Sequence, residues 1–276
     1  MKIGCHISVS KGLLKAAKRA HELGADAFQV FTKNPRALRP KKLNLNDAEK
    51  GKKYCEEQGI TLVCHTPYIT NLSTPKPDLH EVTIRSIKED LAIADAFGAV
   101  GAVVHCGKHV GEGEEYGRRR MVETLNLILE EYEGNTKLLL ENTAGQGSEL
   151  GLSIRELVEI RAAVNRPEKI GFCFDTCHAY AAGVWNGETF ADLVNEMEET
   201  KYLENLVAIH FNDSKAPWGS RKDRHEKIGK GEIGAESLSL FLNEPRFEDL
   251  PVVLETPVED EQEYAEEIRY LRELKK

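Results

Sequence analysis

Nine potential metal ligands are spread along the chain, and most of them stand where a short apolar run ends. Six such runs, from ITLVCH to PVVLE, end in the following side chains: His65, His105, Glu141, Asp175, His210 and Glu255. His178 follows Asp175 by three residues, and Asp223 and His225 form a D-x-H between the last two runs. A buried strand has no structural reason to end repeatedly in an ionisable side chain. We therefore expect the strand ends to converge on one chemical site.

The mixture of imidazoles and carboxylates indicates several cations in one pocket. A single strand-end histidine would ordinarily be a buried imidazole bonded to backbone. Four carboxylates in one pocket, however, repel one another unless cations lie among them. Five histidines and four carboxylates exceed the roughly four ligands that one zinc ion takes, whereas nine ligands with one bridging carboxylate suit three ions. Imidazole and carboxylate ligands favour Zn²⁺, with Mn²⁺ or Fe acceptable at one site.

A cluster of three divalent cations would suit a phosphodiester substrate. Its charge outweighs that of the four carboxylates, so phosphate would be attracted locally. The formal net charge of -9 and the pI of about 5.6 exclude a basic exterior that holds nucleic acid non-specifically. The best local phosphate-binding candidate is the stretch 33–42, which contains five basic residues: Lys33, Arg36, Arg39, Lys41 and Lys42.

The elements that must position these ligands alternate strictly between strand and helix. The predicted strands are Lys2–Cys5, Ala27–Phe31, Thr61–His65, Ala102–His105, Lys137–Glu141, Ile170–Asp175, Leu206–His210 and Pro251–Glu255. The predicted helices are Lys11–Leu23, Leu45–Gln58, Asp78–Phe97, Tyr116–Glu131, Ser153–Val164, Thr189–Thr200, Ala235–Leu242 and Asp260–Leu274. Such alternation predicts a parallel sheet covered by helices. Eight units in 276 residues predict one (β/α)₈ TIM barrel over residues 1–276, with its active site at the carboxyl ends of the strands.

Several other residues carry weaker expectations. The six cysteines show no secreted disulfide framework and are predicted to be free buried thiols, with Cys173 or Cys177 as an alternative metal ligand. Together with the absence of an apolar N-terminal segment, this predicts a cytoplasmic protein. His21 and His80 fall in predicted helices and are expected to be surface or helix-packing residues. His6 and His109 follow predicted strands, so they are expected beside the ligands.

The segment Gly229–Gly234 matches the pattern G-x-G-x-x-G but lacks the strand that a dinucleotide-binding fingerprint requires before it. We expect it instead to let the loop carrying Asp223 and His225 turn tightly. Its backbone N–H groups would then be free to meet phosphate.

Several segments together resemble the endonuclease IV family of AP endonucleases in base-excision repair. They are FTKNPR (31–36), CHTPYITNLS (64–73), VVHCGKH (103–109), LLLENTAGQG (138–147), FDTCHAYAAG (174–183), AIHFNDSK (208–215), GSRKDRHEKIGKGEIG (219–234) and VLETP (253–257). The resemblance implies a TIM barrel with three zinc ions. His65, His105 and Glu141 would hold the first ion. The second would share Glu141 and add Asp175, His210 and Glu255, and the third would take His178, Asp223 and His225. Glu141 would be the catalytic residue.

The same resemblance implies a DNA substrate and the loops that contact it. Arg36 and Tyr68 resemble family residues that enter the duplex at an abasic site, and Ile69 stands where the family often has leucine. Without the resemblance, Arg36 would be a solvated side chain and Tyr68 a residue packed on the barrel rim. The implied partner is double-stranded DNA with an abasic site or a 3′-blocking group. The DNA-binding face must stay open, which favours a monomer, and no membrane is involved.

Two other functions fit part of the pattern. A sugar isomerase or epimerase on the same barrel would use Glu141, Asp175, His210 and Glu255 around a single metal ion, and would not need the other five ligands. A non-catalytic DNA- or metal-binding protein is the second alternative. Metal content separates the first from a nuclease, and nicking of an abasic duplex tests the second.

Overall fold

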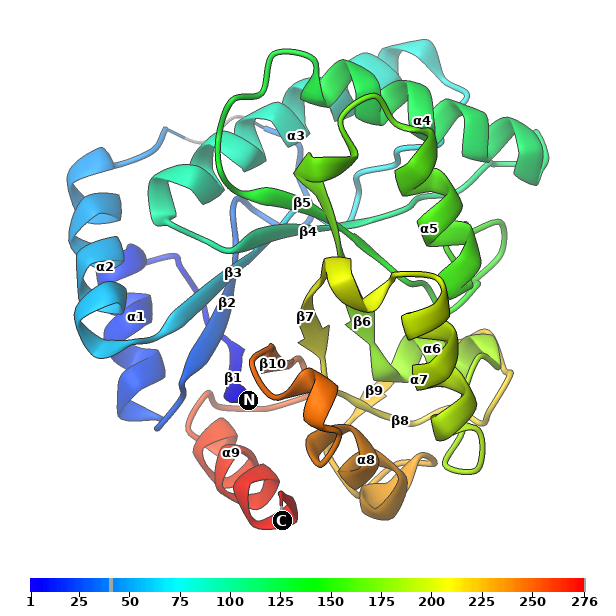
Figure 1. Ribbon diagram of the computed structural model, residues 1–276. Coiled ribbons are helices and arrows are strands. Elements are labelled where there is room, and N and C mark those ends of the chain that lie inside the picture. The colour runs from blue at the N-terminus through cyan, green and yellow to red at the C-terminus, as the bar shows by residue number, and fades with distance from the viewer. Residues whose placement is uncertain (40–41, 276) are drawn as a thin grey trace.

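The computed structural model describes residues 1–39 and 42–275, and its core is a closed barrel of parallel strands (Figure 1). Within the described residues the strand order is β1-β10-β7-β6-β5-β4-β3-β2, and β1 pairs in parallel with both β10 and β2. The barrel strands are β1 Lys2–His6, β2 Ala27–Phe31, β3 Thr61–His65, β4 Gly101–His105, β5 Lys137–Glu141, β6 Ile170–Asp175, β7 Leu206–His210 and β10 Pro251–Leu254. The predicted strands are confirmed to within one residue at each end. Glu255 directly follows its strand.

Helices cover the outside of the barrel, as Figure 1 shows. They are α1 Leu13–Glu22, α2 Leu45–Gln58, α3 Pro77–Phe97, α4 Glu114–Leu129, α5 Ile154–Ala163, α7 Phe190–Glu199, α8 Gly234–Leu242 and α9 Glu263–Leu274. Each corresponds to a predicted helix with ends shifted by up to three residues. Asn44 and Ser153 cap α2 and α5 through their side chains. Gly59 and Gly98 end α2 and α3 in the left-handed conformation. Among the described helices, none is long and apolar enough to cross a membrane.

Short elements at the carboxyl end of the barrel were not expected from the sequence. They are the helix α6 Thr176–Ala182 and an antiparallel pair of strands, β8 Asp213–Ser214 and β9 His225–Glu226. The α6 helix begins at Asp175, whose side chain accepts a hydrogen bond from the His178 backbone N–H at 2.7 Å, and it ends at Gly183 in the left-handed conformation. An Asp cap and a terminal glycine are ordinary helix signals. The short helix could therefore have been predicted from the segment FDTCHAYAAG.

The side chains that point into the barrel form layers, and these layers explain where the ligands lie. One apolar cluster fills the interior: Val63, Val103, Leu139, Cys173, Ala208 and Val253. The six strand-end ligands stand two residues further along the same strands. Because alternate side chains of a strand share a face, the ligands form the next layer, at the mouth of the barrel. The apolar layer thus serves as the floor of a polar site.

Candidate metal centre

The structure brings all nine predicted ligands together. Among the described residues, four groups of side chains have potential ligand atoms within 4.8 Å of one another. Three of them match the predicted sets: His65/His105/Glu141; Glu141/Asp175/His210/Glu255; and His178/Asp223/His225. The fourth, Asp175/Cys177/His225, draws two of its members from these sets.

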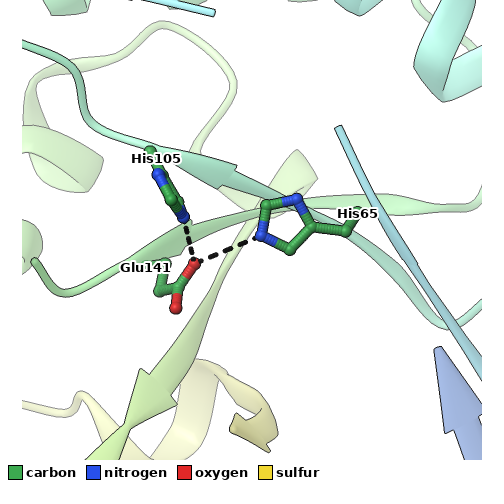
Figure 2. Close-up of side chains that lie close together, drawn as sticks. All are labelled: His65, His105 and Glu141. Atoms are coloured by element: carbon green, nitrogen blue, oxygen red, sulfur yellow. Dashed lines mark ion pairs between the residues drawn. The ribbon is translucent and has the colours of Figure 1, made fainter. Parts of the chain in front are cut away.

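The first group lies where β3, β4 and β5 end, and its three side chains point toward one another (Figure 2). The Glu141 Oε2 atom is 3.1 Å from His105 Nε2 and 3.6 Å from His65 Nε2. His65 and Glu141 are buried, while the His105 side chain is 27% exposed. This group therefore has one edge open to solvent, where a substrate can approach.

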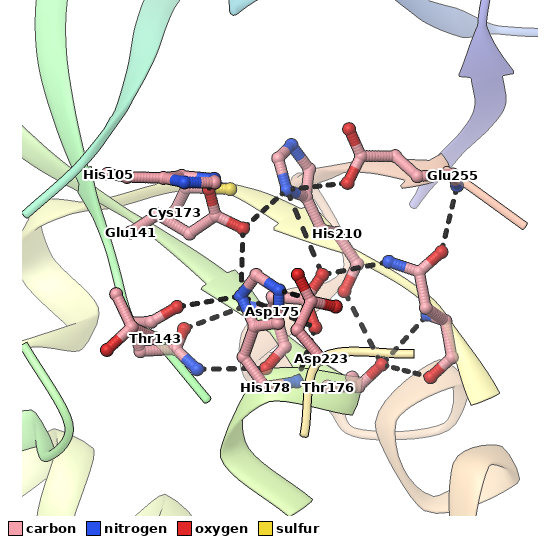
Figure 3. A network of polar contacts seen from close by, with 12 residues as sticks. His105, Glu141, Thr143, Cys173, Asp175, Thr176, His178, His210, Asp223 and Glu255 are labelled. Carbon is pink, nitrogen blue, oxygen red and sulfur yellow. Dashed lines mark hydrogen bonds and ion pairs between the residues drawn. The ribbon is translucent and has the colours of Figure 1, made fainter. Parts of the chain in front are cut away.

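Glu141 also belongs to the second group, through its other oxygen. His210 Nδ1 lies 2.9 Å from Glu141 Oε1 and 3.2 Å from Glu255 Oε2, and Asp175 Oδ2 is 4.0 Å away (Figure 3). Because Oε2 faces the first group and Oε1 the second, the Glu141 carboxylate stands between two candidate cation sites. This is the geometry that a bridging ligand requires.

The third group is assembled by the unexpected elements. His178 comes from α6, and Asp223 and His225 come from the segment after β7, near β9. Asp223 Oδ1 lies 3.3 Å from the Nε2 atoms of both histidines. His178 Nδ1 is also 3.3 Å from Glu141 Oε1. The third group is therefore contiguous with the other two, as the network in Figure 3 shows.

Backbone carbonyls orient three of the ligand imidazoles. The Nδ1 atoms of His65, His178 and His225 lie 2.6, 2.9 and 3.2 Å from the carbonyl oxygens of Thr66, Asn142 and Glu255. When Nδ1–H donates to a carbonyl, the neutral ring presents the lone pair of Nε2 to the cluster. Such outer hydrogen bonds are typical of histidines that ligate metals.

The electrostatics of these residues fit cations at this place. Glu141 Oε2 and His225 Nε2 are buried and have no hydrogen-bond partner among the described residues, and a bound cation would satisfy both atoms. Burial alone would raise the pKa of Glu141, but His210 and His105 hold it well below its usual range. Burial likewise opposes the charged form of His178, yet Asp175 and Asp223 raise its pKa well above the usual value. Without cations, only protonated histidines balance the carboxylates.

The cysteine predictions are tested by burial and contacts. All six cysteines are free and buried, as expected. Cys173 lies in the apolar layer below the ligands. Burial raises the pKa of Cys177 to about 12, which opposes the thiolate form that binds metal. The imidazole and carboxylate groups are the better ligands.

The predicted DNA-contacting residues lie at the mouth of the barrel. Tyr68 and Ile69 are 50% and 46% exposed in the loop after β3, and Arg36 is exposed in the loop after β2. The Tyr68 backbone N–H donates to Pro35 O at 3.0 Å, which ties these two loops together. The Tyr68 ring centroid lies 5.7 Å from that of His65. Two large apolar side chains exposed beside the candidate metal site suggest a binding surface.

The prediction that the stretch 33–42 as a whole binds phosphate is wrong for Lys33. Its side chain is buried and donates to Ser86 O at 2.9 Å, and its Nζ atom lies 3.2 Å from the buried carboxylate of Asp90. The charge of Lys33 is thus used inside the protein. Lys41 lies outside the described residues. The side chains of Arg36, Arg39 and Lys42 are exposed and remain candidates.

The prediction that the Gly229–Gly234 loop leaves its N–H groups free for phosphate is also wrong. The backbone N–H groups of Gly229, Gly231 and Ile233 donate to the Asp213 carboxylate at 2.9, 3.0 and 3.0 Å. The buried carboxylate of Asp213, the first residue of β8, already occupies the place that a phosphate would take. The expected tight turn is present, with positive φ at Gly229 and Gly234.

Of the four remaining histidines, two pack between helices and two lie in or beside the loops near the candidate metal centre. His21 on α1 contacts the Tyr54 hydroxyl, and His80 on α3 contacts Thr124 Oγ1, so both are helix-packing residues as predicted. His109 Nδ1 accepts from the Gly113 N–H within its own loop, so its only described side-chain hydrogen bond is not to a ligand. His6 lies 3.3 Å from Gln29, which in turn contacts Glu255 and His210.

Three amide side chains that support the ligands were not anticipated from the sequence: Gln29, Asn142 and Asn212. Asn212 Nδ2 donates to Asp175 Oδ2 at 2.8 Å, and Asn212 Oδ1 accepts from the Glu255 N–H at 2.9 Å. Asn142 Oδ1 accepts from the Asp175 N–H at 2.8 Å. The only sequence signal was their position, because Asn142 and Asn212 each stand within two residues of a strand-end ligand.

Comparisons with known proteins show the family to which the chain belongs. The model of a family described as xylose isomerase-like TIM barrel matches residues 17–274. A Symbiobacterium thermophilum protein named Probable endonuclease 4 is 55% identical over 99% of both chains. The crystal structure of endonuclease IV from Thermus thermophilus superposes with a TM-score of 0.87 at 33% identity, covering 99% of this chain and 98% of that one. D-Psicose 3-epimerase from Clostridium cellulolyticum H10 reaches a TM-score of 0.69 at 15% identity over 100% and 98% of the two chains, which shows the fold alone. With its nine ligand-type side chains gathered at the barrel mouth, the chain belongs to the endonuclease IV family.

Proposed function

We propose that this protein is a metal-dependent AP endonuclease of base-excision repair. It hydrolyses the DNA phosphodiester 5′ to an abasic site and leaves a 3′-hydroxyl and a 5′-deoxyribose phosphate. The observation that carries the proposal is the Glu141 carboxylate, whose two oxygens face two different ligand groups. That arrangement, with a third group 3.3 Å away through His178, suits phosphodiester hydrolysis better than single-metal sugar chemistry.

The nine ligand-type residues would hold three Zn²⁺ ions, one of which Mn²⁺ or Fe could replace. His65, His105 and Glu141 would hold one ion, and Glu141 would share the second with the following residues: Asp175, His210 and Glu255. His178, Asp223 and His225 would hold the third. When bound, such ions lower the pKa of a water molecule and neutralise the charge on the leaving oxygen. The protein keeps the ligands buried and oriented, so that little rearrangement is needed at the moment of reaction.

Arg36, Tyr68 and Ile69 recognise the damaged duplex. An abasic nucleotide has no base to unstack, so it leaves the helix at lower cost than an intact one. The exposed side chains of Tyr68 and Ile69 can fill the gap that is left. DNA containing an abasic site or a 3′-blocking group is thus the partner, and we propose a cytoplasmic monomer with this face open.

The main rival is a sugar isomerase or epimerase with one metal ion. The epimerase-like structures share the fold at low identity, and their activity would leave the His65/His105 and His178/Asp223/His225 groups without a purpose. The deciding experiment combines metal analysis with incision of a duplex that carries one abasic site, with and without a chelator. Close to three ions per chain and chelator-sensitive incision support the nuclease. One ion per chain and no incision would overturn it.

A further inference from the structure

Gln29 is a polar side chain beside the apolar interior layer of the barrel, and its register partner on β1 is His6. Gln29 also pairs in register with Val63, a member of the apolar interior cluster, while its neighbours Phe28 and Val30 pack in the outer core. Gln29 is fully buried. Burying an amide costs free energy unless its hydrogen bonds are made, and an apolar side chain would fill this place without that cost. The contacts of the amide should therefore explain its presence.

Two of those contacts are with candidate metal ligands, and the third joins Gln29 Nε2 to His6 Nδ1 at 3.3 Å. Gln29 Nε2 donates to Glu255 Oε1 at 2.7 Å, and Gln29 Oε1 lies 2.8 Å from His210 Nε2. An ionised carboxylate can only accept, so the amide NH₂ group must face Glu255. The amide oxygen then faces His210, and the hydrogen of that ring is held on Nε2.

This orientation determines which atoms are presented to a cation. When the ring is neutral and its Nε2–H is bonded to Gln29, Nδ1 is the nitrogen left for a cation, and this atom lies 2.9 Å from Glu141 Oε1 and 3.2 Å from Glu255 Oε2. With Glu255 Oε1 bonded to the amide, Oε2 is the oxygen left for a cation. One side chain thus sets the ligand atom of two residues in the same group.

Gln29 does this across the barrel. It comes from β2, which pairs with β1 and β3, whereas His210 ends β7 and Glu255 follows β10. His65, His178 and His225, in contrast, are oriented by backbone carbonyls that every sequence provides. Only a particular side chain at position 29 can orient His210 in this way.

We propose that Gln29 is a positioning residue for the Glu141/Asp175/His210/Glu255 cation site and sets the affinity of that site. The inference rests on the proposed metal centre and deepens it. Loss of an outer hydrogen-bonding partner lowers metal affinity by about 10- to 100-fold. Because Gln29 contacts one of the three proposed sites, its removal should weaken the binding of one ion and leave the affinity for the other two unchanged.

The test is competition between zinc-loaded protein and a chromophoric zinc chelator. Gln29→Met keeps the length of the side chain and suits the apolar layer, and Gln29→Asn keeps an amide that is too short to reach. Both variants should release one ion at about 10- to 100-fold lower chelator concentration than wild type. Their cobalt-substituted forms should show an altered visible spectrum for that ion. Val63→Ala disturbs the same layer without touching a ligand, and it should keep the wild-type release curve.

The outcomes separate this inference from the proposed function. Wild-type protein that binds three ions and incises abasic DNA, together with Gln29→Met and Gln29→Asn curves like the wild-type curve, would overturn the role of Gln29 alone. Equal loss in Val63→Ala would also overturn it, because packing would then be the cause. Wild-type protein that binds no metal would overturn the metal centre and this inference together.

Discussion

One oxygen of Asp175 caps the helix that carries His178, and the other faces His225 of the same ligand group and, at 4.0 Å, the Nδ1 atom of His210 in the second group. Oδ1 accepts from the His178 N–H at 2.7 Å, while Oδ2 lies 3.6 Å from His225 Nε2 and accepts from Asn212 at 2.8 Å. The same carboxylate therefore builds a local element and takes part in the site. Strand β6, helix α6 and the two groups of ligands are coupled through this single side chain.

Two substitutions should separate these roles of Asp175. Asparagine caps helices as well as aspartate does, so Asp175→Asn should keep the metal-free stability of wild type and lose metal affinity and activity. Asp175→Ala should also lose metal affinity and activity. In addition, its free energy of unfolding in the metal-free state should be about 1 kcal/mol lower than that of wild type. Chelator competition and urea unfolding measure the two effects. Ser153→Ala, which removes the cap of the remote helix α5, should lower stability alone. If Asp175→Asn retained full metal content, its proposed role as a ligand would be wrong.

Glu141→Gln should lower kcat by several orders of magnitude while the fold remains intact. A neutral amide is a poor bridge between two cations and removes one negative charge from between the His105 and His210 rings. Steady-state incision of an abasic duplex measures the loss, and circular dichroism checks the fold. Turnover like that of the wild type would contradict the placement of Glu141 at the centre of catalysis.

Tyr68→Ala and Arg36→Ala should raise KM for abasic duplex. Metal content should stay unchanged, because neither side chain is one of the proposed metal ligands. The loss should be larger for abasic duplex than for a nicked duplex with a 3′-blocking group, which needs less distortion of the helix. Leu127→Ala, at an exposed apolar side chain on α4, serves as the control. Equal losses on both substrates would mean that the loops supply general phosphate affinity rather than a wedge.

Metal binding should release protons near neutral pH. Burial opposes charge on His178 and His210, but the surrounding acidic groups raise the pKa of both imidazoles well above the usual value in the metal-free protein. Their protons are therefore still bound at pH 7 and must leave when a cation arrives. Apparent metal affinity should rise with pH until these raised pKa values are passed, and activity should fall below about pH 6. Calorimetry in buffers of different ionisation enthalpy counts the protons. Heats that do not depend on the buffer would contradict this linkage.

Lys33→Met should destabilise the fold rather than weaken DNA binding. It leaves the Asp90 carboxylate buried without its cation, and breaking a buried pair from one side costs about 3–5 kcal/mol. The double variant Lys33→Met/Asp90→Asn should recover much of that loss. Arg39→Ala, at an exposed position of the same stretch, should leave stability unchanged. Free energies of unfolding measure the effect. If Lys33→Met bound DNA more weakly at unchanged stability, Lys33 would instead belong to the phosphate-binding surface.

The alternation of apolar runs with helical patterns was sufficient to predict the barrel, and six of the nine ligand-type side chains stand at the ends of those runs. A run such as KLLLE indicates a buried strand and the side chain at its carboxyl end, and the helices between successive runs indicate that the strands are parallel. Once the strands close into a barrel, their ends must converge. Six of the nine ligand-type side chains could thus be placed at one end of the barrel before any distance was known.

Only the tertiary structure decided which partner each polar group finds. Lys33 looked like part of a basic surface, but it turns inward because the Asp90 carboxylate lies beneath it. The Gly229–Gly234 amides looked free, but Asp213, separated from them in sequence, accepts from them. Gln29 looked like one more strand residue until the barrel placed it against His210 and Glu255. Hydrogen bonds and ion pairs act over a few ångströms in space, so residues distant in sequence can satisfy a group whose local pattern gives no sign of them.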